Sequence, residues 1–561
     1  MRDLAGWRKL AGILTGCIAT VIAGQAQIFT KLADFNGATA IPQNMTLVQA
    51  TDGNLYGTTT NMELGPGTVF RLSTDGKLSI LYNFCSRPMC ADGNVPYSGV
   101  ILGTDGNLYG TTLQGGANRA GTIFRLTLGG ALTVLYNFCN LANCIDGGAP
   151  FGGVIEGSDD NLYGTTVRGG SFNGGTIYKF TPSGLTTMYS FCSQGSPCPD
   201  GAWPEAALSQ GFDGSFYGST FMGGVGPCPN GGTLFKITPS GVFTTLWDFS
   251  QCFGGAQPVA PLLELSNSRF YGITTGGPYC CGTIFNTTTS GGFTALYTFC
   301  QEKYCSDGRD PGAPLALGSD GNVYGTTILG GGSVNCLSGC GTIFQASLDR
   351  LTAVYGFCLL SGCLDGYNPE GGLLQATNGV FYGTASLGGA YGAGTAFSLN
   401  MGLDSFVAFV RGHGKAGQIS GLLGQGFTGT TGVFFNGVSA NYVVMSDTYL
   451  TATVPAGGTS GVVTVTTPTG TLTSNVPFRV LPQLLSFTPT SGPVGTQVTI
   501  TGVSFTQTSG VGFGDYTPAQ FTVNSDTQVT ATVPAGAQTG PVGIQTQGGI
   551  AISTQTFTVT Q

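Results

Sequence analysis

The feature that most constrains the fold is a unit of 53 to 58 residues that occurs seven times. Each copy holds four short β-type segments between turn residues, as in "PYSGVILGT", "LYGTTL", "GTIFRLTL" and "ALTVLYNF" of the second copy. Four-stranded antiparallel units repeated without intervening helices predict a β-propeller, with a linear β-solenoid as the alternative. The copies are marked by the tyrosine of the "DGNLYGTT" segment, at Tyr56, Tyr109, Tyr163, Tyr217, Tyr271, Tyr324 and Tyr382.

The fragment "QIFTKLADFNGATAIP" favours the propeller over the solenoid. It matches the fourth segment of the repeat, whereas the seventh copy has only the first three segments before the sequence changes near residue 400. Residues 28–35 are therefore expected to pair with the strand near residue 395. A ring closed in this way leaves no unpaired strand edge. The predicted fold is all-β, with a seven-bladed β-propeller over residues 27–402 closed by an N-terminal strand.

Composition agrees with an all-β chain and excludes one class of partner. Only 8% of the residues are charged and 96 are glycine, and apolar residues at helical spacing are absent. The net charge of -8 and the pI of about 4.6 leave no basic face. Because binding to a phosphate backbone depends on such a face, we expect no nucleic-acid partner.

The first 26 residues are expected to be a signal peptide. Basic residues precede the apolar stretch "LAGILTGCIATVIAG", which is too short to span a bilayer, and small residues end at Ala26. The segment "LTGC" also has the form of a lipoprotein box, so a lipid anchor at Cys17 is the alternative to cleavage after Ala26. The protein is expected to be exported to the cell surface or the extracellular space, without a transmembrane span in the mature chain.

The cysteines of an exported chain favour disulfides. Five near pairs follow the fourth segment of a copy, each within a C-x(4 or 5)-C-x-D-G-x-x-P pattern. Zinc would need ligands from separate loops to converge, so it is the weaker interpretation. Cys228, Cys252, Cys280 and Cys281 are left, and we favour a bond from Cys252 to one of the other three. The expected pairs are Cys85 with Cys90, Cys139 with Cys144, Cys192 with Cys198, Cys300 with Cys305, Cys336 with Cys340, and Cys358 with Cys363.

Two related segments follow the repeats. "SDTYLTATVPAGGTSG" in residues 403–481 returns as "SDTQVTATVPAGAQTG" in residues 482–561, each within a run of short alternating strands. Their length and alternation predict two immunoglobulin-like β-sandwiches in tandem.

Two family resemblances rest on these motifs. The "LYGTT" and "GTIF" unit resembles the tandem GloVer repeat of exported bacterial proteins, over roughly residues 28–400. The segments "PTSGPVGT", "FNGV" and "SDTQVTATVPAG" are similar to IPT/TIG domains, which are immunoglobulin-like modules of surface proteins. The first sandwich departs from that pattern at "VRGHGKAG". The repeat family implies an extracellular location but no activity and no catalytic residues.

Topology predicts which face of the propeller binds. The loop between the second and third segments and the crossover to the next copy share one side of the ring, called the loop side. The short "DGN" and "PSG" turns share the other, called the turn side. Variable loops held by a rigid frame are where binding usually occurs, so a ligand is expected on the loop side. Its larger side chains are Tyr97, Arg119, Arg168, Trp203, Tyr279, Arg309 and Tyr367.

The sequence favours a binding protein over an enzyme. The single histidine, His413, lies between two glycines and is expected to be an exposed turn residue. Glu205 and Glu370 share the place after the crossover proline, and a pair across the channel could serve a polysaccharide lyase or hydrolase. One carboxylate per Asp-Gly turn falls short of a calcium cage. We expect no catalytic residue, metal or cofactor, and a glycan or protein ligand; a structural surface-layer role is the third hypothesis.

Overall fold

The computed structural model describes residues 27–37, 40–61, 65–227, 230–251, 255–265, 269–276, 281–333, 335–347, 350–514 and 516–561. Over these residues the chain is built of β-strands, and the helical segments are short 3₁₀ turns. In this part of the chain no helix has the length and apolar character needed to cross a membrane. The expected signal peptide, with Cys17, lies outside the described residues.

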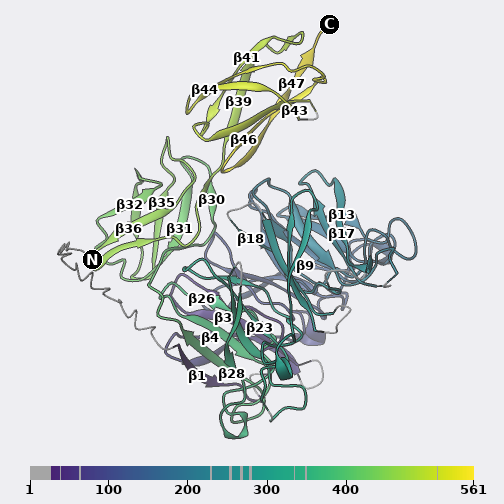
Figure 1. Cartoon of the computed structure of the whole chain (residues 1–561), viewed down its shortest axis with the longest axis vertical. Coiled ribbons are helices and arrows are strands. Elements are labelled where there is room, and N and C mark those ends of the chain that lie inside the picture. Colours follow the sequence, from purple (N-terminus) through teal and green to yellow (C-terminus); the bar gives the residue numbers. More distant parts are fainter. Residues whose placement is uncertain are drawn as a thin grey trace, which may run out of the picture.

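Each copy of the repeat corresponds to one four-stranded antiparallel sheet (Figure 1). The first copy has the order β2 (Val48–Gln49), β3 (Leu55–Asn61), β4 (Gly65–Leu72), β5 (Leu78–Asn83). The next copies keep this order, with β6 (Ile101–Leu102), β7 (Leu108–Thr112), β8 (Thr122–Leu126), β9 (Leu132–Asn137); β10 (Val154–Glu156), β11 (Leu162–Thr166), β12 (Thr176–Thr181), β13 (Gly184–Ser190); β14 (Ser209–Gln210), β15 (Phe216–Thr220), β16 (Thr233–Ile237), β17 (Phe243–Asp248); β18 (Leu263–Leu265), β19 (Arg269–Thr274), β20 (Thr283–Thr288), β21 (Phe293–Thr298); and β22 (Ala316–Leu317), β23 (Val323–Thr327), β24 (Thr342–Ala346), β25 (Leu351–Gly356).

The sheet of the seventh copy takes its outer strand from the N-terminal segment. Its order is β1 (Ile28–Asp34), β28 (Thr395–Asn400), β27 (Phe381–Ala385), β26 (Leu374–Gln375). β1 runs antiparallel to β28, from Ile28 opposite Asn400 to Asp34 opposite Thr395, and the two strands lie side by side in Figure 1. Phe29 stacks on Tyr355 of the sixth copy, with ring centroids 3.8 Å apart. The pairing is the one that the repeat register predicts.

Repeated polar pairs explain why the copies share one local structure. In the "DGN" turn, Asp105 accepts a hydrogen bond from the Tyr109 hydroxyl at 2.8 Å and from the backbone N–H of Asn107 at 3.0 Å. At the other end of the strand the buried hydroxyls of Thr112 and Thr122 lie 2.9 Å apart. The bond between the threonines satisfies hydroxyl groups that the packed sheets bury, and the exposed turn carboxylate already has partners in the fold.

Neighbouring copies are joined by a recurring contact on the turn side. The amide oxygen of Gln210 accepts a hydrogen bond from the backbone N–H of Ser158 in the preceding copy at 2.9 Å. In the same way, the amide oxygen of Gln49, in the first copy, accepts a hydrogen bond from the backbone N–H of Thr377, in the seventh, at 2.9 Å. The first and last copies therefore meet as consecutive copies do.

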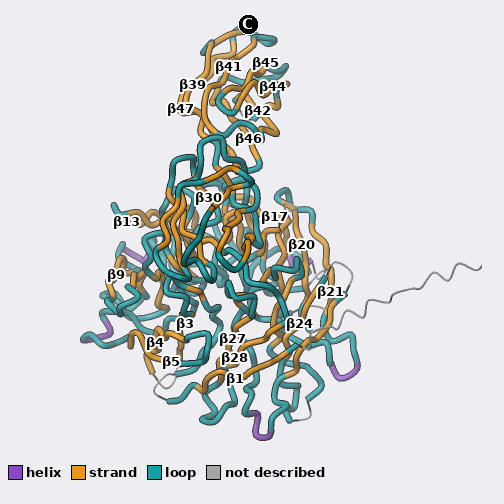
Figure 2. The backbone as a smooth tube through the Cα atoms, turned by 90° about the vertical axis from the view of Figure 1, so that its left-hand side faces the viewer, coloured by secondary structure: helices purple, strands orange, loops and turns teal. Residues whose placement is uncertain are grey.

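Disulfide loops follow the outer strands. The 3₁₀ turns are η1 (Pro88–Cys90), η2 (Ala142–Cys144), η3 (Phe249–Gln251), η4 (Lys303–Cys305) and η5 (Ser361–Cys363), and Figure 2 shows such turns at the periphery of the repeat region. Disulfides join Cys85 to Cys90, Cys139 to Cys144, Cys192 to Cys198, Cys300 to Cys305, Cys336 to Cys340, and Cys358 to Cys363. The sulfurs of Cys336, Cys340 and Cys358 lie within 4.8 Å of one another, but as members of disulfides they are not zinc-binding thiolates. Cys228, Cys252 and Cys280 lie outside the described residues.

The C-terminal part forms two successive sandwiches with matching strand orders (Figures 1 and 2). Each encloses its own cluster of buried apolar side chains. The first has sheets β29-β31-β35-β34, β33-β32-β36-β37 and β30-β38, from β29 (Ala408–Phe409), β30 (His413–Gly414), β31 (Ile419–Leu423), β32 (Gly432–Phe435), β33 (Val438–Ser439), β34 (Tyr442–Val444), β35 (Tyr449–Thr453), β36 (Val463–Thr467), β37 (Gly470–Thr473) and β38 (Arg479–Val480). The second has β39-β41-β45-β44 and β40-β47-β46-β42-β43, from β39 (Gln483–Thr488), β40 (Ser491–Gly492), β41 (Gln497–Val503), β42 (Thr508–Phe513), β43 (Thr517–Pro518), β44 (Gln520–Ser525), β45 (Gln528–Thr532), β46 (Gly540–Thr546) and β47 (Gly549–Val559).

The first sandwich packs on the turn side of the repeats. Thr448 donates a hydrogen bond to the carbonyl of Thr51 at 3.1 Å, and Gln425 donates to Thr377 at 2.8 Å, both acceptors being in turns between the first two strands of a copy. Arg411 forms an ion pair with Asp160, in the same turn of the third copy. The loop side is therefore the side of the repeats away from this interface.

The expectation that His413 is an exposed turn residue is wrong. Its side chain is buried, and its backbone pairs with Arg479 in the β30-β38 bridge. Arg479 in turn donates to the carbonyl of Gly211 at 3.2 Å, so the histidine lies beside the interface with the repeats. Burial and the charges of Arg479 and Arg411 lower the pKa of His413 to about 3. The ring is therefore neutral at pH 7.

Candidate functional site: a cavity shared by all copies of the repeat

A cavity of about 440 Å³ is lined by residues from every copy of the repeat. Much of its wall comes from one equivalent position, the residue after the crossover proline, and the first copy contributes Asn44 from the same crossover. The variety of side chains at that position gives the cavity two kinds of wall, one aromatic and one acidic. The residues at that position in copies two to seven are Tyr97, Phe151, Glu205, Val259, Gly312 and Glu370.

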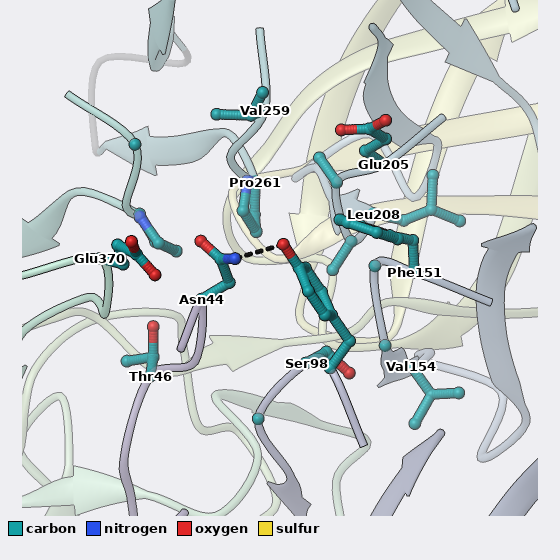
Figure 3. Close-up of a pocket in the computed structure, with 18 of the residues that line it drawn as sticks. Asn44, Thr46, Ser98, Phe151, Val154, Glu205, Leu208, Val259, Pro261 and Glu370 are labelled. Atoms are coloured by element: carbon teal, nitrogen blue, oxygen red, sulfur yellow. Dashed lines mark hydrogen bonds between the residues drawn. The ribbon is translucent and has the colours of Figure 1, made fainter. Parts of the chain in front are cut away.

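The aromatic wall is formed by Tyr97 and Phe151. Their ring centroids are 3.9 Å apart and the planes are tilted by 43°. The side-chain amide of Asn44 donates a hydrogen bond to the Tyr97 hydroxyl, drawn as the dashed line in Figure 3. The bond holds the Tyr97 hydroxyl and the side-chain carbonyl of Asn44 in the cavity, beside the flat apolar surface of the rings. Such a combination suits a ligand with C–H faces and hydroxyl groups.

The cavity has two acidic residues, Glu205 and Glu370, which together are called the acidic wall. They approach from different sides of the cavity in Figure 3. Burial raises the pKa of Glu205 to about 7 and also raises the pKa of Glu370. Burial, followed by the negative charges of Glu370 and Glu205, raises the pKa of Tyr97 to about 12. At neutral pH the phenol is therefore protonated, and Glu205 exchanges its proton near that pH.

The raised pKa of Glu205 predicts a loss of stability with rising pH. The folded value of about 7 lies above the ordinary 4.5, so the folded chain binds the proton more tightly than the unfolded chain. The stabilisation that this tighter proton binding gives the folded chain is complete below pH 4.5 and is lost as the pH rises through 7. We compare the free energy of unfolding of Glu205→Gln with that of the wild type. Allowing for the partial solvent access of the carboxyl group, we expect this difference to shift in favour of the variant by about 2 kcal/mol from pH 5 to pH 9. Denaturant unfolding at both pH values measures the gain.

Glu302→Gln is the control for this experiment. Glu302 is exposed and lies outside the cavity, so its replacement makes the same carboxylate-to-amide change away from the site. The gain expected for Glu205→Gln should be absent from this variant. Equal stability differences between Glu205→Gln and the wild type at the two pH values would contradict the burial of the carboxyl group.

The structure separates the side chains that the sequence predicted for the loop side. Tyr97 lines the cavity, and Arg119 and Arg168 line a second cavity of about 530 Å³ beside it. Trp203 is 43% exposed and lines neither cavity. Arg309 forms an ion pair with Asp310 at 3.2 Å. Tyr367 packs against a hydrophobic cluster of the sixth and seventh copies, and Tyr279 lies outside the described residues.

Sequence reasoning missed two of the cavity residues. Phe151 occupies the same place after the crossover proline as Glu205 and Glu370, so the recurrence of that position was a usable signal. Asn44 had no comparable signal, because it lies in the partial copy at the N-terminus, where the repeat pattern is weakest. The carboxyl pair was considered only for a catalytic role.

Family models match most of the chain. The Gloeobacter/Verrucomicrobia repeat matches residues 15–144 and 139–335, and the IPT/TIG domain matches residues 482–560. No curated protein sequence matches the chain.

Similarity to solved structures is low. Surface glycan-binding protein PbSGBP-B from Prevotella bryantii is 17% identical with a TM-score of 0.21, and the match covers 26% of this chain and 37% of that one. A fungal alcohol oxidase of the AA5 family, in complex with copper, is 12% identical with a TM-score of 0.41, over 95% and 99% of the two chains. SGBP-B of a Bacteroides ovatus mixed-linkage glucan utilization locus, in complex with a heptasaccharide, is 19% identical with a TM-score of 0.15, over 32% and 52%. TM-scores this low assign neither a fold nor a ligand to this chain.

Proposed function

The chain belongs to the Gloeobacter/Verrucomicrobia repeat family and ends in an IPT/TIG domain, and from this premise we propose that it is an extracellular glycan-binding protein. Its repeats, residues 27–402, close into a seven-bladed propeller whose central cavity holds a segment of the glycan. The sandwiches, residues 403–481 and 482–561, act as spacers that leave the loop side free. The first 26 residues direct export, by cleavage after Ala26 or by lipidation at Cys17.

Three observations support the closed ring. β1 completes the sheet of the seventh copy, and the contact between Thr377 and Gln49 repeats the contact between Ser158 and Gln210. In addition, a single cavity is lined by every copy. A linear solenoid would hold the first and last copies apart, so it would need a separate explanation for each of these contacts.

The observation that carries the ligand class is the pairing of the aromatic wall with polar groups. The tilted rings of Tyr97 and Phe151 offer an apolar surface, and Asn44, Glu205 and Glu370 supply hydrogen-bonding groups around it. Sugars present C–H faces beside hydroxyl groups and therefore fit both walls. The disulfide loops support an oxidising, extracellular location.

Replacing Tyr97 with Ala is expected to weaken glycan binding at least about tenfold, because the ring and its hydroxyl are lost together from the half-buried aromatic wall. The full chain is screened on an array of neutral and acidic polysaccharides, and the affinity of each variant for the polysaccharide bound most tightly is measured by calorimetry. Tyr304→Ala is the control, since Tyr304 is an aromatic residue, 78% exposed, on the disulfide loop of the fifth copy. Unchanged binding by Tyr97→Ala would refute the assignment of the cavity.

The raised pKa of Glu205 favours one alternative, an extracellular polysaccharide hydrolase or lyase. A carboxyl group that keeps its proton near pH 7 can act as a general acid, and Glu370 could serve as its partner. Release of new sugar ends from the bound polysaccharide, abolished in Glu205→Gln, would replace the binding proposal with this one. A binding protein gives no release, and Glu205→Gln should still bind.

A further inference from the structure

We propose that a groove between the second and third copies binds the anionic group of an acidic polysaccharide, which narrows the ligand class given under the proposed function and rests on it. The groove is the cavity of about 530 Å³ on the loop side, here called the arginine groove. The side chains that matter to the argument are Gln114, Arg119, Asn143, Phe151, Arg168 and Asn173.

Two guanidinium groups in this groove have no counter-charge. Arg119 and Arg168 are exposed, and neither side chain has an ion-pair or hydrogen-bond partner among the residues that the structure describes. Other basic side chains of the repeats, such as Lys179, Lys236 and Arg309, do form ion pairs. The lining of the groove contains no carboxylate, although the whole chain has a net charge of -8. The groove is therefore a local cationic site on an acidic protein.

The carboxylate of the adjoining disulfide loop does not neutralise the two arginines. Asp146 is buried, and it accepts hydrogen bonds from the Tyr136 hydroxyl at 2.7 Å and from the backbone N–H groups of Asn140 and Leu141. These donors use its oxygens to hold the loop. The guanidinium groups remain free to receive an external anion.

Arg119 occupies a backbone conformation that the other copies reserve for other residue types. Its φ is +61°, in the left-handed region, where a long side chain is strained. This position lies two residues before the glycine that begins the "GTIF" segment of each copy. The third, fourth, sixth and seventh copies have Asn173, Asn230, Gly339 and Gly392 there. Asn and Gly tolerate this conformation best. The arginine of the second copy is therefore held in a strained backbone conformation.

The position of Arg168 shows the same contrast. It directly precedes a Gly-Gly pair. At this position the first, second and fifth copies have Asn61, Gln114 and Gly276, and copies four, six and seven have Met222, Leu329 and Leu387. Backbone hydrogen bonds between Arg168 and Gly148, at 2.9 and 3.1 Å, fix the residue at the mouth of the loop. Arginine therefore occurs at this position in the third copy alone, at the border of the groove.

The arginine groove adjoins the central cavity. Phe151 lines both, and its ring lies against Tyr97. A sugar ring on the aromatic wall would place the substituent of a neighbouring sugar within the groove. Guanidinium groups bind carboxylates and sulfates through paired hydrogen bonds, so the predicted ligand carries one of these groups at regular intervals.

The test compares polygalacturonate with its fully methyl-esterified form, because esterification removes the charge and keeps the sugar backbone. Calorimetry with the full chain should show at least tenfold tighter binding to polygalacturonate. Dextran sulfate against dextran tests whether sulfate is preferred to carboxylate. Wild-type binding that does not distinguish the charged from the uncharged member of either pair overturns the inference.

Three variants locate the effect. Arg119→Asn installs the residue of the third copy, so it should keep or raise the unfolding midpoint while weakening polygalacturonate binding at least tenfold; Arg168→Gln should weaken it similarly. Arg309→Gln is the control and should bind normally. If both groove variants bind like the wild type while Tyr97→Ala loses binding, the inference fails and the proposed function stands. If no charged or neutral polysaccharide is bound, both fail.

Discussion

Removing residues 27–35 is expected to lower the unfolding midpoint of the repeat region by on the order of 10 °C and to make the protein aggregate. The deletion takes away the strand that pairs with β28 and the ring of Phe29, which stacks on Tyr355. The deletion also removes Phe35, which is fully buried, and loss of a buried phenylalanine alone costs about 3 to 5 kcal/mol. The exposed edge of β28 then offers unpaired backbone groups to other chains. Calorimetry and size-exclusion chromatography compare a chain that begins at Gln27 with one that begins at Asn36.

Adding the strand back distinguishes closure from general damage. A synthetic peptide of residues 27–37 should bind the shortened chain by adding a strand to β28 and should restore most of the lost stability. Thr30→Ala, at an exposed position of the same strand, is the control and should change little. Equal midpoints for the two chain lengths would contradict a ring closed by the N-terminal strand.

The repeat made much of the fold predictable. Because a period fixes which segments are equivalent, the partial copy around Phe29 could be matched with the strand missing after Asn400 without knowledge of the structure. The near pairs of cysteines, such as Cys85 and Cys90, were equally accessible, since a short loop leaves few other partners in sequence. These predictions depend on local pattern alone.

Other features depend on contacts between distant segments and could not be predicted in this way. His413 was misplaced because its burial depends on Arg479, 66 residues further on, and on the neighbouring repeats. The site was predicted only in part. The sequence placed Glu205 and Glu370 at one equivalent position, but a period does not reveal whether two side chains from different copies line the same cavity. The strain at Arg119 is likewise a property of the backbone dihedral, which residue type alone does not disclose.

Substituting Gly121 with Ala is expected to destabilise the repeat region by at least about 3 kcal/mol. The φ of Gly121 is +97°, which strains any residue with a Cβ atom. That Cβ would also clash with the carbonyl oxygen of Thr112 and lie 2.7 Å from Cδ of Pro150, in the crossover to the next copy. Overpacking of this kind adds to the strain. Denaturant unfolding of the full chain, followed by tryptophan fluorescence and circular dichroism, measures the loss.

Gly129→Ala is the matched control for Gly121→Ala. Gly129 lies in a turn of the same copy, and the nearest heavy atom to an added Cβ is Oγ1 of Thr127 at 3.7 Å. The control should therefore change stability by less than about 0.5 kcal/mol. A similar loss in both variants would mean that alanine acts through general loss of turn flexibility and not through the contact between copies.

A double-mutant cycle with Pro150→Ala separates backbone strain from the contact between copies. Removing the pyrrolidine ring relieves the clash with Cδ but leaves the strain at φ and the clash with the Thr112 carbonyl oxygen, so the double variant should recover part of the stability lost by Gly121→Ala. The same glycine-to-proline contact recurs between other consecutive copies, at Gly67 with Pro96 and at Gly175 with Pro204. Strictly additive losses would show that the proline does not join the copies. Recovery would identify this contact as one that sets the spacing of the repeats, and hence the width of the cavity that they enclose.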